Sequence, residues 1–358
     1  MFKTTLGPFL LLLLSHLSST ALAFTMKARV AVVGSANQDL TTYTAVLPQM
    51  GETVTGTTFA TSCGGKGSNQ ACAAASLGLT PVTMICRMGD DVFAKDLLAN
   101  FKKKGVHVDE EATILQGIST GVASIVVDTK TGDNMIIVTP GANHQMKASD
   151  VERSLKGLSE KPAAVVVQLE ILKEAALAAL KTGSELGAIT ILNPAPAPEA
   201  GVLDDFYKYT DIIIPNETEL RKICGVVEDA KGGSDMEEYL AKQLLTDSGV
   251  RKAVIVTLGA RGAMVVARDQ EGADGVTVSY VNQPDDLPCK NDPIADTIGA
   301  GDAFCGALAA YLSSGVGLEE AAAMACGLAS MSIRRTGASY PSPDEIPDCL
   351  KIKSAVDC

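Results

Sequence analysis

The sequence predicts an α/β protein whose central sheet is doubly wound and mostly parallel, with helices on both faces. Three observations support this. Apolar runs of strand length alternate with longer runs of helical length along most of the chain. The run from Arg29 to Gly34 has the continuous apolar pattern of a strand buried on both faces of a parallel sheet. Polar or glycine-rich clusters directly follow several of these strands, at the edge where open α/β sheets place ligands.

The elements of the main domain follow from this alternation, short apolar runs being assigned as strands and longer ones as helices. In chain order the predicted strands are 29–34, 82–86, 164–168, 188–192, 211–214, 253–257 and 263–267, with a further short strand after the second helix. The predicted helices are 71–79, 93–104, 173–186, 303–313 and about 318–334.

Some β-prone segments interrupt the alternation and predict a small separate sheet. Residues 43–61 carry alternating β-prone side chains, and residues 121–127 and 134–138 flank a turn as a β-hairpin does. We therefore expect one main domain over 26–350, with a small β-sheet lid built from about 43–61 and 121–139. Residues 351–358 form a C-terminal tail.

Composition limits the class of protein. The chain has 358 residues, of which 46% are hydrophobic and 20% charged, as suits a globular protein with a large core. A net charge of −12 argues against a nucleic-acid-binding surface, and no basic run contradicts that. An anionic ligand of such an acidic chain needs locally concentrated positive potential, from backbone amides, a lysine and bound cations.

Residues 1–25 form a hydrophobic leader. Lys3 precedes a short apolar stretch, and Ala21-Leu22-Ala23 fits a signal-peptidase site. The stretch is too short to span a membrane, so no span is expected in the mature protein. Phe24 after that site resembles the junction of plastid-import presequences, and Met26 is an alternative start.

Two features favour a cytoplasmic protein, with the nucleus as a second compartment, over plastid or secretory import through the leader. Nine cysteines without paired spacing suit reduced thiols. The single glycosylation sequon begins at Asn216, inside an expected ligand site. N-terminal sequencing that finds Phe24 first contradicts the cytoplasmic prediction.

The heptapeptide from Asp296 to Asp302 predicts an anion site. The small residues Gly299, Ala300 and Gly301 let backbone N–H groups converge at the start of a predicted helix, whose dipole adds positive potential. Such a place stabilises a transferring phosphoryl group, and Asp302 at its edge suits a base that accepts a hydroxyl proton. By itself, the heptapeptide fits an ordinary capped helix equally well.

Three further clusters carry polar side chains. Gly64 to Asn69 is no Walker A loop, because Gly67 follows the lysine, but its glycines permit close approach to a ligand. Glu170 follows one strand, and Asn216 and Glu219 follow another, with oxygen atoms that suit hydrated Mg²⁺. A solvated turn and helix caps are the alternatives. No strand-to-helix turn fits G-x-G-x-x-G, so the chain lacks the nicotinamide dehydrogenase fingerprint.

In combination these motifs resemble the ribokinase-like family of carbohydrate kinases, over nearly the whole chain after the leader, from about Ala28 to Pro347. The segments that carry the resemblance are Val33 to Asp39, Gly51 to Gly56, Gly64 to Ala71, Gln168 to Glu170, Asn193 to Ala197, Pro215 to Glu219 and Asp296 to Asp302.

The resemblance implies transfer of the γ-phosphoryl group of ATP to the 5-hydroxyl of D-ribose, with Mg²⁺ and activating K⁺, by a homodimer joined through the lid. A kinase for another sugar or for a nucleoside, such as 2-deoxyribose, fructose or adenosine, is the nearest alternative. A sugar-binding regulator without catalysis is a further one, which the presence of Asp302 disfavours.

The resemblance also implies residue roles. Asp302 would be the general base, and the amides of Gly299, Ala300 and Gly301 the anion hole. The sugar ligands would be Asn37, Asp39, Gly65, Lys66, Asn69, Glu170 and Asp302. The nucleotide would contact Asn216, Thr257, Leu258, Gly259, Ala260, Arg261, Gly262 and Gly301, with Glu219 placing Mg²⁺. The K⁺ ligands would be Asp296 and the carbonyls of Ile298, Ser332, Arg335 and Gly337, with a differently spaced final ligand near Pro341.

Overall fold

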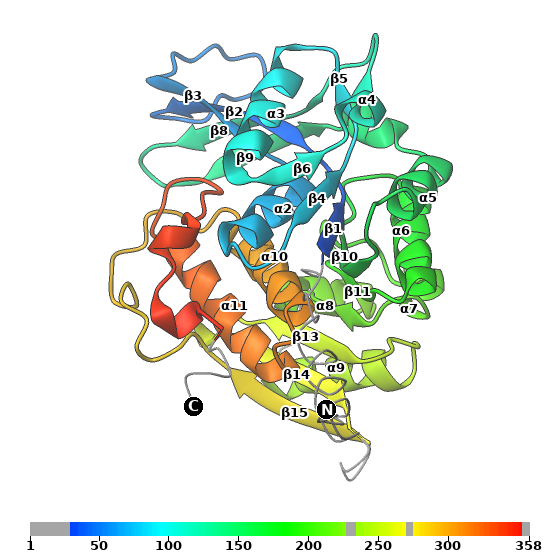
Figure 1. Cartoon of the computed structure of the whole chain (residues 1–358). Helices are drawn as coiled ribbons and strands as arrows, with labels where there is room; N and C mark the ends of the chain where they lie inside the picture. The colour runs from blue at the N-terminus through cyan, green and yellow to red at the C-terminus, as the bar shows by residue number, and fades with distance from the viewer. Residues whose placement is uncertain (1–28, 227–233, 270–274, 353–358) are drawn as a thin grey trace, which may run out of the picture.

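The computed structural model describes residues 29–226, 234–269 and 275–352 (Figure 1). The predicted leader and most of the predicted C-terminal tail therefore lie outside the described residues. The large central sheet has nine described strands in the order β15-β14-β13-β12-β11-β10-β1-β4-β6. Every neighbouring pair is parallel except those that include β14. The predicted fold class is confirmed.

The strands of this sheet agree closely with the predicted ones, β6 being the short strand expected after the second helix, and only β15 was not predicted. They are β1 (Arg29–Val33), β4 (Val82–Ile85), β6 (Val106–Val108), β10 (Pro162–Val167), β11 (Ile189–Leu192), β12 (Ile212–Ile213), β13 (Ala253–Thr257), β14 (Ala263–Arg268) and β15 (Val276–Val281). A two-stranded sheet pairs β5 (Met88–Gly89) with β7 (Ile114–Leu115).

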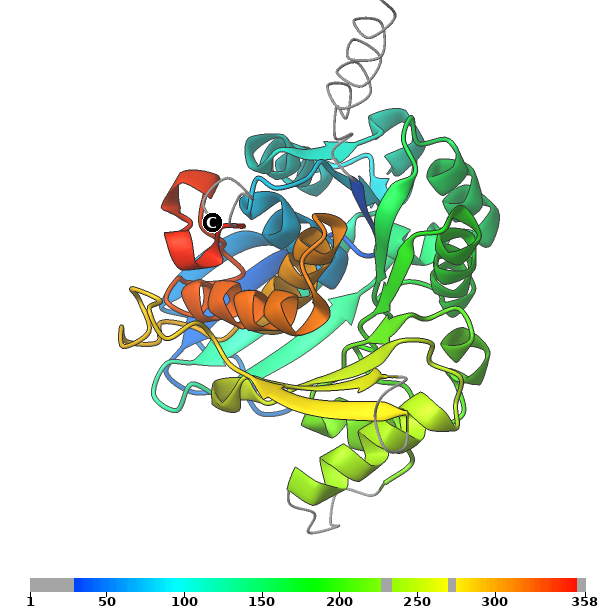
Figure 2. The same ribbon diagram turned by 60° about the horizontal axis from the view of Figure 1, so that its bottom comes forward.

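Helices cover the sheet on both faces, as the view along the sheet shows (Figure 2). One face packs against α2 (Lys66–Ser76), α10 (Ala300–Ser313) and α11 (Leu318–Ser332). The other carries α5 (Ala148–Lys156), α6 (Lys173–Leu186), α7 (Asp204–Tyr207), α8 (Glu217–Ile223) and α9 (Ser234–Thr246). The remaining elements are α3 (Val92–Lys104), α4 (Glu110–Thr113), η1 (Gly141–Gln145), η2 (Gly259–Arg261), η3 (Pro343–Glu345) and η4 (Asp348–Leu350). Within β1 and β10, Val30 to Val33 and Ala164 to Val167 have no exposed surface, because each strand is covered twice.

The small sheet is separate from the central one and lies at the top of Figure 1. Its order is β3-β2-β8-β9, formed by β2 (Asn37–Thr44), β3 (Thr58–Gly64), β8 (Gly121–Asp128) and β9 (Asn134–Thr139). Only the two ends of the predicted range 43–61 belong to strands of this sheet, because residues 45–57 form a loop and β2 begins earlier, at Asn37. That loop contains Pro48 and Gly51, and Gly51 has a φ of 80°.

Two helices begin earlier than predicted. α2 begins at Lys66 rather than at Ala71, because Gly65 adopts a φ of 88° and turns the chain directly into the helix. α10 begins at Ala300 rather than at Ala303, after Gly299 in the left-handed region. The side chains of Lys66, Asn69 and Asp302 therefore project from first helical turns, with fixed directions, rather than from loops.

The chain reverses its direction of travel across the sheet between β1 and β10. From β1 the strands proceed to β4 and β6, whereas from β10 they proceed the opposite way to β13. In open α/β sheets, ligands bind outside the carboxyl ends of the strands at such a switch point. Ser35 follows β1 and Gln168 follows β10, so this rule places the ligand site beside them.

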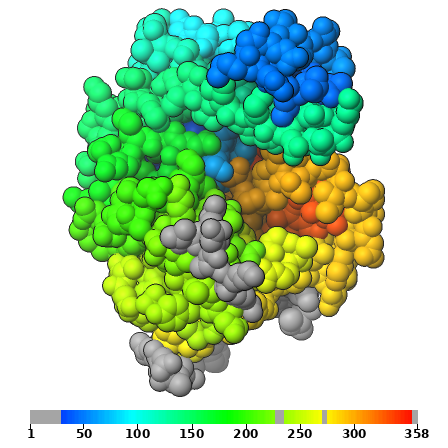
Figure 3. Space-filling model, turned by 180° about the vertical axis from the view of Figure 1, so that it is seen from behind, coloured from blue at the N-terminus to red at the C-terminus, as the bar shows by residue number. Residues whose placement is uncertain are grey.

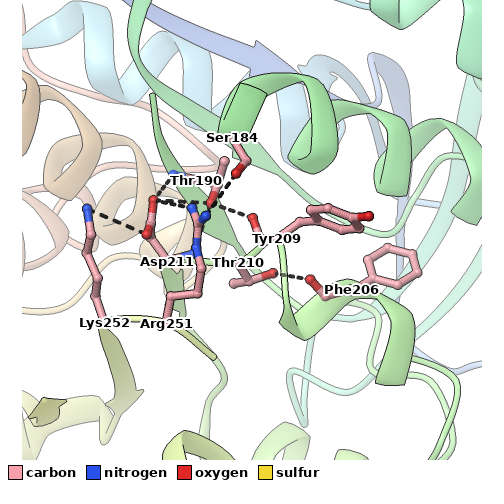
Figure 4. A network of polar contacts seen from close by, with 8 residues as sticks. All are labelled: Ser184, Thr190, Phe206, Tyr209, Thr210, Asp211, Arg251 and Lys252. Carbon is pink, nitrogen blue, oxygen red and sulfur yellow. Dashed lines mark hydrogen bonds and ion pairs between the residues drawn. The ribbon is translucent and has the colours of Figure 1, made fainter. Parts of the chain in front are cut away.

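The opposite edge of the sheet, at the amino ends of β11, β12 and β13, holds an ion-pair network (Figure 4). The buried Asp211 carboxylate pairs with Arg251 at 3.0 Å and with Lys252 at 3.5 Å. It also accepts a hydrogen bond from the Thr190 backbone N–H at 3.0 Å, and Arg251 donates to the Ser184 hydroxyl at 2.8 Å. This network joins three neighbouring strands and α6.

The helices of the described residues include none long and apolar enough to cross a membrane.

Candidate active site

Asp302 is a buried carboxylate in the first turn of α10, at the carboxyl edge of the central sheet. Only 6% of the residue is exposed. Its Oδ2 accepts a hydrogen bond from the Asn69 side-chain amide, and its Oδ1 accepts one from the Gln70 amide, both at 3.0 Å. Burial raises the pKa of Asp302, although the charge of Lys66 and these two amides act against it. Both oxygens are thus held in place by donors from α2.

Glu170 joins the ends of β1 and β10 to the start of α2. Its Oε2 accepts hydrogen bonds from the Ser35 hydroxyl at 2.6 Å and from the Lys66 backbone N–H at 3.0 Å. Burial by itself acts to lower the pKa of the Lys66 ammonium. The nearby carboxylates of Asp302, Glu170 and Glu219 outweigh that effect and raise it, so the ammonium stays charged.

Asp39 extends the group of carboxylates from the small sheet. Burial, then the charges of Glu170 and Asp302, raise its pKa to about 7. On the neighbouring strand a Cβ at Gly64 would lie 2.2 Å from Asp39 Oδ2, so glycine is required to leave room for this carboxylate. Three carboxylates held this close together favour a ligand that supplies hydrogen-bond donors.

Asn37 and Gly65 complete the predicted sugar-binding group. Asn37 Oδ1 accepts a hydrogen bond from the Asn143 amide at 2.7 Å. Asn143 Oδ1 in turn accepts one from the Ala36 backbone N–H at 3.0 Å. A Cβ at Gly65 would lie 2.8 Å from the Asn37 nitrogen, which shows how closely the two segments approach. The residues predicted to hold the sugar are therefore brought to one place.

A polar cavity of about 200 Å³ lies beside Asp302 at the start of α10. From behind, the molecule is hollowed between the small sheet and the segments below it (Figure 3). The lining of the cavity includes the predicted residues Lys66, Asn216, Glu219, Thr257, Gly299, Ala300, Gly301 and Asp302. It also includes Asn193, Ala195, Ile214, Thr297 and Cys305, to which the sequence assigned no role.

A second cavity, of about 530 Å³, adjoins the first and is the larger of the two. Both are lined by Thr257, Thr297, Ala300 and Gly301. The second is also lined by the predicted Gly259, Ala260 and Gly262, and by Asn282, Gln283, Lys290, Ile294, Phe304, Cys326, Ala329, Ser330, Ile333 and Arg334. A volume of this size admits a nucleoside. Five of the unpredicted residues lie on α11 and at its end and recur at helical spacing, a signal that the sequence carries.

Two residues of the predicted nucleotide segment lie outside both linings. Leu258 is buried in the hydrophobic core. The Arg261 guanidinium pairs with Glu217 at 2.5 Å, which holds it at the start of α8. The segment from Thr257 to Gly262 therefore borders the cavity through its glycines and small side chains.

Asn216 and Glu219 form a capping box at the start of α8. Asn216 Oδ1 accepts a hydrogen bond from the Glu219 backbone N–H, and Glu219 Oε2 accepts one from the Asn216 backbone N–H, both at 2.8 Å. Burial raises the pKa of Glu219, while the Asn216 hydrogen bond and Lys66 act against it. Carboxylate and amide oxygens at the cavity wall fit Mg²⁺, which is bound through few protein ligands and keeps several waters.

Asp296 ties the loop before α10 to the loop after α11. Its Oδ1 accepts a hydrogen bond from the Ile298 N–H at 2.9 Å, and its Oδ2 accepts one from the Gly337 N–H at 3.0 Å. The Ser332 carbonyl accepts from the Arg335 N–H at 3.0 Å, and the Arg335 side chain pairs with Glu345 at 2.7 Å.

The predicted K⁺ ligands thus come from two loops that the Asp296 carboxylate holds together. Pro341, the residue given for the differently spaced final ligand, is buried. One carboxylate among backbone carbonyls is a donor set that suits a hard cation of low charge. Among the described residues no group of three or more His, Cys, Asp or Glu side chains suits a metal such as zinc.

The structure adds four polar residues near the site to which the sequence assigned no role. They are Ser35, Gln70, Asn143 and Asn193, and all are buried. Three of them stand inside the motifs quoted above, but a single sequence does not show which side chain of a motif touches a ligand and which holds another side chain.

Comparison with known proteins agrees with this architecture. The pattern of the pfkB family carbohydrate kinases matches residues 27–345. A deoxyribokinase of Salmonella typhi is 35% identical over 329 residues, which cover 90% of this chain and 99% of that protein. The ribokinase of Mus musculus is 34% identical over 330 residues, which cover 90% of this chain and 95% of that protein.

Solved structures show the same fold. The ribokinase of Giardia lamblia superposes with a TM-score of 0.77 at 30% identity, covering 89% of this chain and 97% of that one. The Arabidopsis thaliana ribokinase, solved in complex with ribose and ATP, has a TM-score of 0.74 at 27% identity, covering 92% of this chain and 100% of that one. The chain belongs to the pfkB family of carbohydrate kinases.

Proposed function

We propose that this kinase transfers the γ-phosphoryl group of ATP to the 5-hydroxyl of D-ribose, with Asp302 as general base. One observation carries the proposal: the Asp302 carboxylate is buried, held on both oxygens, and placed at the amino end of α10 on the wall of the polar cavity, which adjoins the larger one. A base beside a helix amino terminus, where an anion is stabilised, suits phosphoryl transfer to a hydroxyl.

The sugar side offers many fixed hydrogen-bond partners. The carboxylates of Asp39, Glu170 and Asp302 accept hydrogen bonds from hydroxyls, and the Lys66 ammonium and Asn37 amide donate them. Each buried polar group that a wrong ligand leaves unpaired costs about 1–3 kcal/mol, so the group discriminates between sugars.

In the proposed reaction the sugar oxygen forms a bond to the γ-phosphorus as the bond to the β,γ-bridging oxygen of ATP breaks, which releases ADP. The hydroxyl proton passes to an oxygen of Asp302. The amides of Gly299, Ala300 and Gly301 stabilise the negative charge on the transferring group. A pKa raised by burial suits Asp302 to accept a proton and release it after each turnover.

Two cation sites complete the proposal. Glu219 and Asn216 would hold Mg²⁺ through its waters, and this ion neutralises phosphate charge when bound. Asp296 and the carbonyls of Ile298, Ser332, Arg335 and Gly337 would hold K⁺, with Pro341 at the edge of the site. Asp296 itself connects the two loops, and so orients the amides that begin at Gly299.

The small sheet supports the proposal of a homodimer. Exposed apolar residues gather on it: Phe59, Met135, Ile136, Ile137 and Val138, with 71% of Ile137 exposed. Consecutive residues of a strand face opposite sides, so both faces of β9 are open. One side of the sheet would cover the sugar and the other would meet a second copy. If light scattering finds only monomer, the proposed homodimer is contradicted. We expect the substitution Ile137→Asp to shift the equilibrium from dimer towards monomer.

A kinase for 2-deoxyribose is the second candidate, because the Salmonella typhi deoxyribokinase and the Mus musculus ribokinase are almost equally similar to this chain, at 35% and 34% identity.

The test of the substrate measures kcat/KM for ribose, 2-deoxyribose, fructose and adenosine, with ATP and Mg²⁺, in a buffer that contains K⁺ and in one that does not. We expect ribose to be preferred and K⁺ to raise kcat. A higher kcat/KM for another acceptor shows that ribose is not the preferred substrate. If none of the acceptors is phosphorylated, the proposal of kinase activity is wrong.

A further inference from the structure

Beneath Asp302 lies a chain of buried side-chain amides that the proposed reaction does not use directly. Gln168 Nε2 donates to Gln70 Oε1 at 2.5 Å. Gln70 Nε2 donates to Asn193 Oδ1 at 3.1 Å and to Asp302 Oδ1 at 3.0 Å. Asn193 Nδ2 donates to the Ile214 backbone carbonyl at 2.9 Å. Gln70 and Gln168 have no exposed surface.

The Ile214 end of this chain determines which group donates and which accepts in each of its hydrogen bonds. The Ile214 carbonyl can only accept a hydrogen bond, so Asn193 must present its NH₂ group there. The Asn193 side-chain oxygen then faces Gln70, which must donate a hydrogen bond to it from its own NH₂ group. That group has two hydrogens, and the second points to Asp302 Oδ1. A flipped Gln70 amide would place an oxygen against the oxygens of Asn193 and Asp302.

The surrounding backbone approaches the side chain of Gln168 and the backbone of Gln70 closely. A Cβ at Gly34, the residue after β1, would lie 1.9 Å from Gln168 Oε1. A Cβ at Gly306 of α10 would lie 2.3 Å from the Gln70 carbonyl oxygen. Both glycines thus permit the contact of α2 with its neighbours that brings Gln70 to Asp302. Side chains packed this tightly keep one rotamer.

We propose that Gln70 is a positioning residue for catalysis, which fixes the rotamer of Asp302 and keeps its carboxylate ionised, and that the Ile214 carbonyl sets its orientation through Asn193. This inference rests on the proposed role of Asp302 in phosphoryl transfer, but not on ribose as the acceptor. Ile214 directly precedes Pro215 and Asn216, so the same chain links the base to the turn at the Mg²⁺ side of the cavity.

The charged and titratable groups around Asp302 come from several elements, and they set the background against which Gln70 acts. They are Lys66 of α2, Asp39 of β2, Glu170 after β10, Glu219 of α8, Cys305 of α10 and the buried Tyr340 after α11. Gln70 carries no charge, so replacing it by an apolar residue removes a hydrogen bond and leaves the charges of these groups unchanged.

The first test compares the pH dependence of kcat in the wild type and in Gln70→Met, whose side chain has nearly the same volume. Loss of the donor disfavours the ionised base, so the acid limb of the profile is expected to move up by about one pH unit. We expect kcat near neutrality to fall about 10- to 100-fold, with the KM for ATP unchanged. A loss that is equal at every pH, with an unmoved limb, overturns the proposal.

Ser76→Ala is the matched control. Ser76 is buried on the same helix, but its hydroxyl donates only to the Ala73 carbonyl at 2.7 Å, away from the site. We expect it to leave both kcat and the pH profile unchanged. If it moves the profile as Gln70→Met does, the effect belongs to the packing of α2 and the proposal fails.

Gln70→Glu provides a second variant of the same shape. While the new carboxyl group is protonated it can still donate to Asp302, but once ionised it repels Asp302 and donates nothing. We therefore expect a descending limb of kcat at alkaline pH that the wild type lacks. A profile with the wild-type shape contradicts the proposal.

The assay uses whichever acceptor the wild type phosphorylates, which separates this inference from the identity of the substrate. Should no acceptor be phosphorylated, the proposed function fails, and the pKa of Asp302 is then followed by its carboxyl carbon resonance, assigned with Asp302→Asn. A higher pKa in Gln70→Met than in the wild type supports the role of Gln70 without turnover. An unchanged pKa overturns it.

Discussion

Two buried aspartates at opposite edges of the central sheet have opposite surroundings. Asp211, at the amino ends of the strands, has two cationic partners, Arg251 at 3.0 Å and Lys252 at 3.5 Å (Figure 4). Asp302, at the carboxyl edge, is held by the neutral amides of Asn69 and Gln70. One carboxylate is neutralised by direct ion pairs, whereas the other is oriented by neutral donors and kept available to a ligand.

The difference shows what each edge contributes. A carboxylate with its own ion pairs is already compensated in the folded protein, so its removal leaves the two cations without a counter-ion. A buried carboxylate without such a pair has a raised pKa, so its ionisation opposes folding and prepares it to accept a proton. Removing the charge from each aspartate should therefore have opposite consequences for activity and stability.

The largest effect is expected from Asp302→Asn. Loss of a general base lowers kcat about 10²- to 10⁴-fold, whereas ribose binding is retained because the other sugar ligands remain. The free energy of unfolding is expected to stay within about 1 kcal/mol of the wild type, because removal of a buried charge offsets the loss of one of the two hydrogen bonds that the carboxylate accepts. Steady-state kinetics and urea denaturation measure both quantities, and a variant that unfolds much more easily would weaken the comparison.

Asp211→Asn should do the reverse. It leaves Arg251 and Lys252 without their counter-ion, and we expect the free energy of unfolding to fall by about 2–3 kcal/mol, since both cations remain partly exposed. Turnover by the folded protein should stay within about twofold. Asp205→Asn is the matched control, because the pair of Asp205 with Lys208 is exposed, and its loss should be worth less than about 0.5 kcal/mol.

A smaller effect is expected from Asp39→Asn, and it depends on pH. The pKa of Asp39 is raised to about 7 from an ordinary value of 3.8. Between these two pH values the folded protein binds more protons at this group than the unfolded chain does, so Asp39 lowers stability as the pH rises, and its effect is constant above about pH 7.

Asp39→Asn should therefore raise the free energy of unfolding at about pH 8, by about 1–2 kcal/mol after allowance for partial exposure, and by little at about pH 4. Urea denaturation at the two pH values checks this in the absence of sugar. If the variant and the wild type have equal free energies of unfolding at the higher pH, ionisation of Asp39 does not destabilise the folded protein. Ribose affinity should fall in the variant, because one acceptor of the sugar-binding group is lost.

The fold could be predicted from the sequence because its signals are local. The apolar runs at Arg29–Val33 and Ala253–Thr257 mark buried strands, and Lys173–Leu186 has the length and pattern of a helix. The edge strand Val276–Val281 was missed because its residues are mostly half-buried and alternate between apolar and polar, and so do not form a continuous apolar run. The loop at 45–57 was missed because its β-prone residues have no neighbouring strand to pair with.

The site could be predicted only in part. Glycines and polar residues after strands indicated Lys66, Glu170, Asp302 and the cavity wall at Asn216 and Glu219. The supporting residues could not be identified, since the contact of Gln70 with Asp302 joins positions 232 residues apart. Whether a buried amide touches a ligand or another side chain depends on packing between helices, which no local pattern encodes.

The most direct test of the base is the rate of phosphoryl transfer in a single turnover, measured by rapid quench at saturating sugar over a range of pH. The wild-type rate should rise with pH as one group loses its proton and then become constant. Asp302→Asn should be slower by at least about 100-fold and independent of pH over the same range. If Asp302→Asn retains the wild-type pH profile at a rate near that of the wild type, Asp302 is not the base.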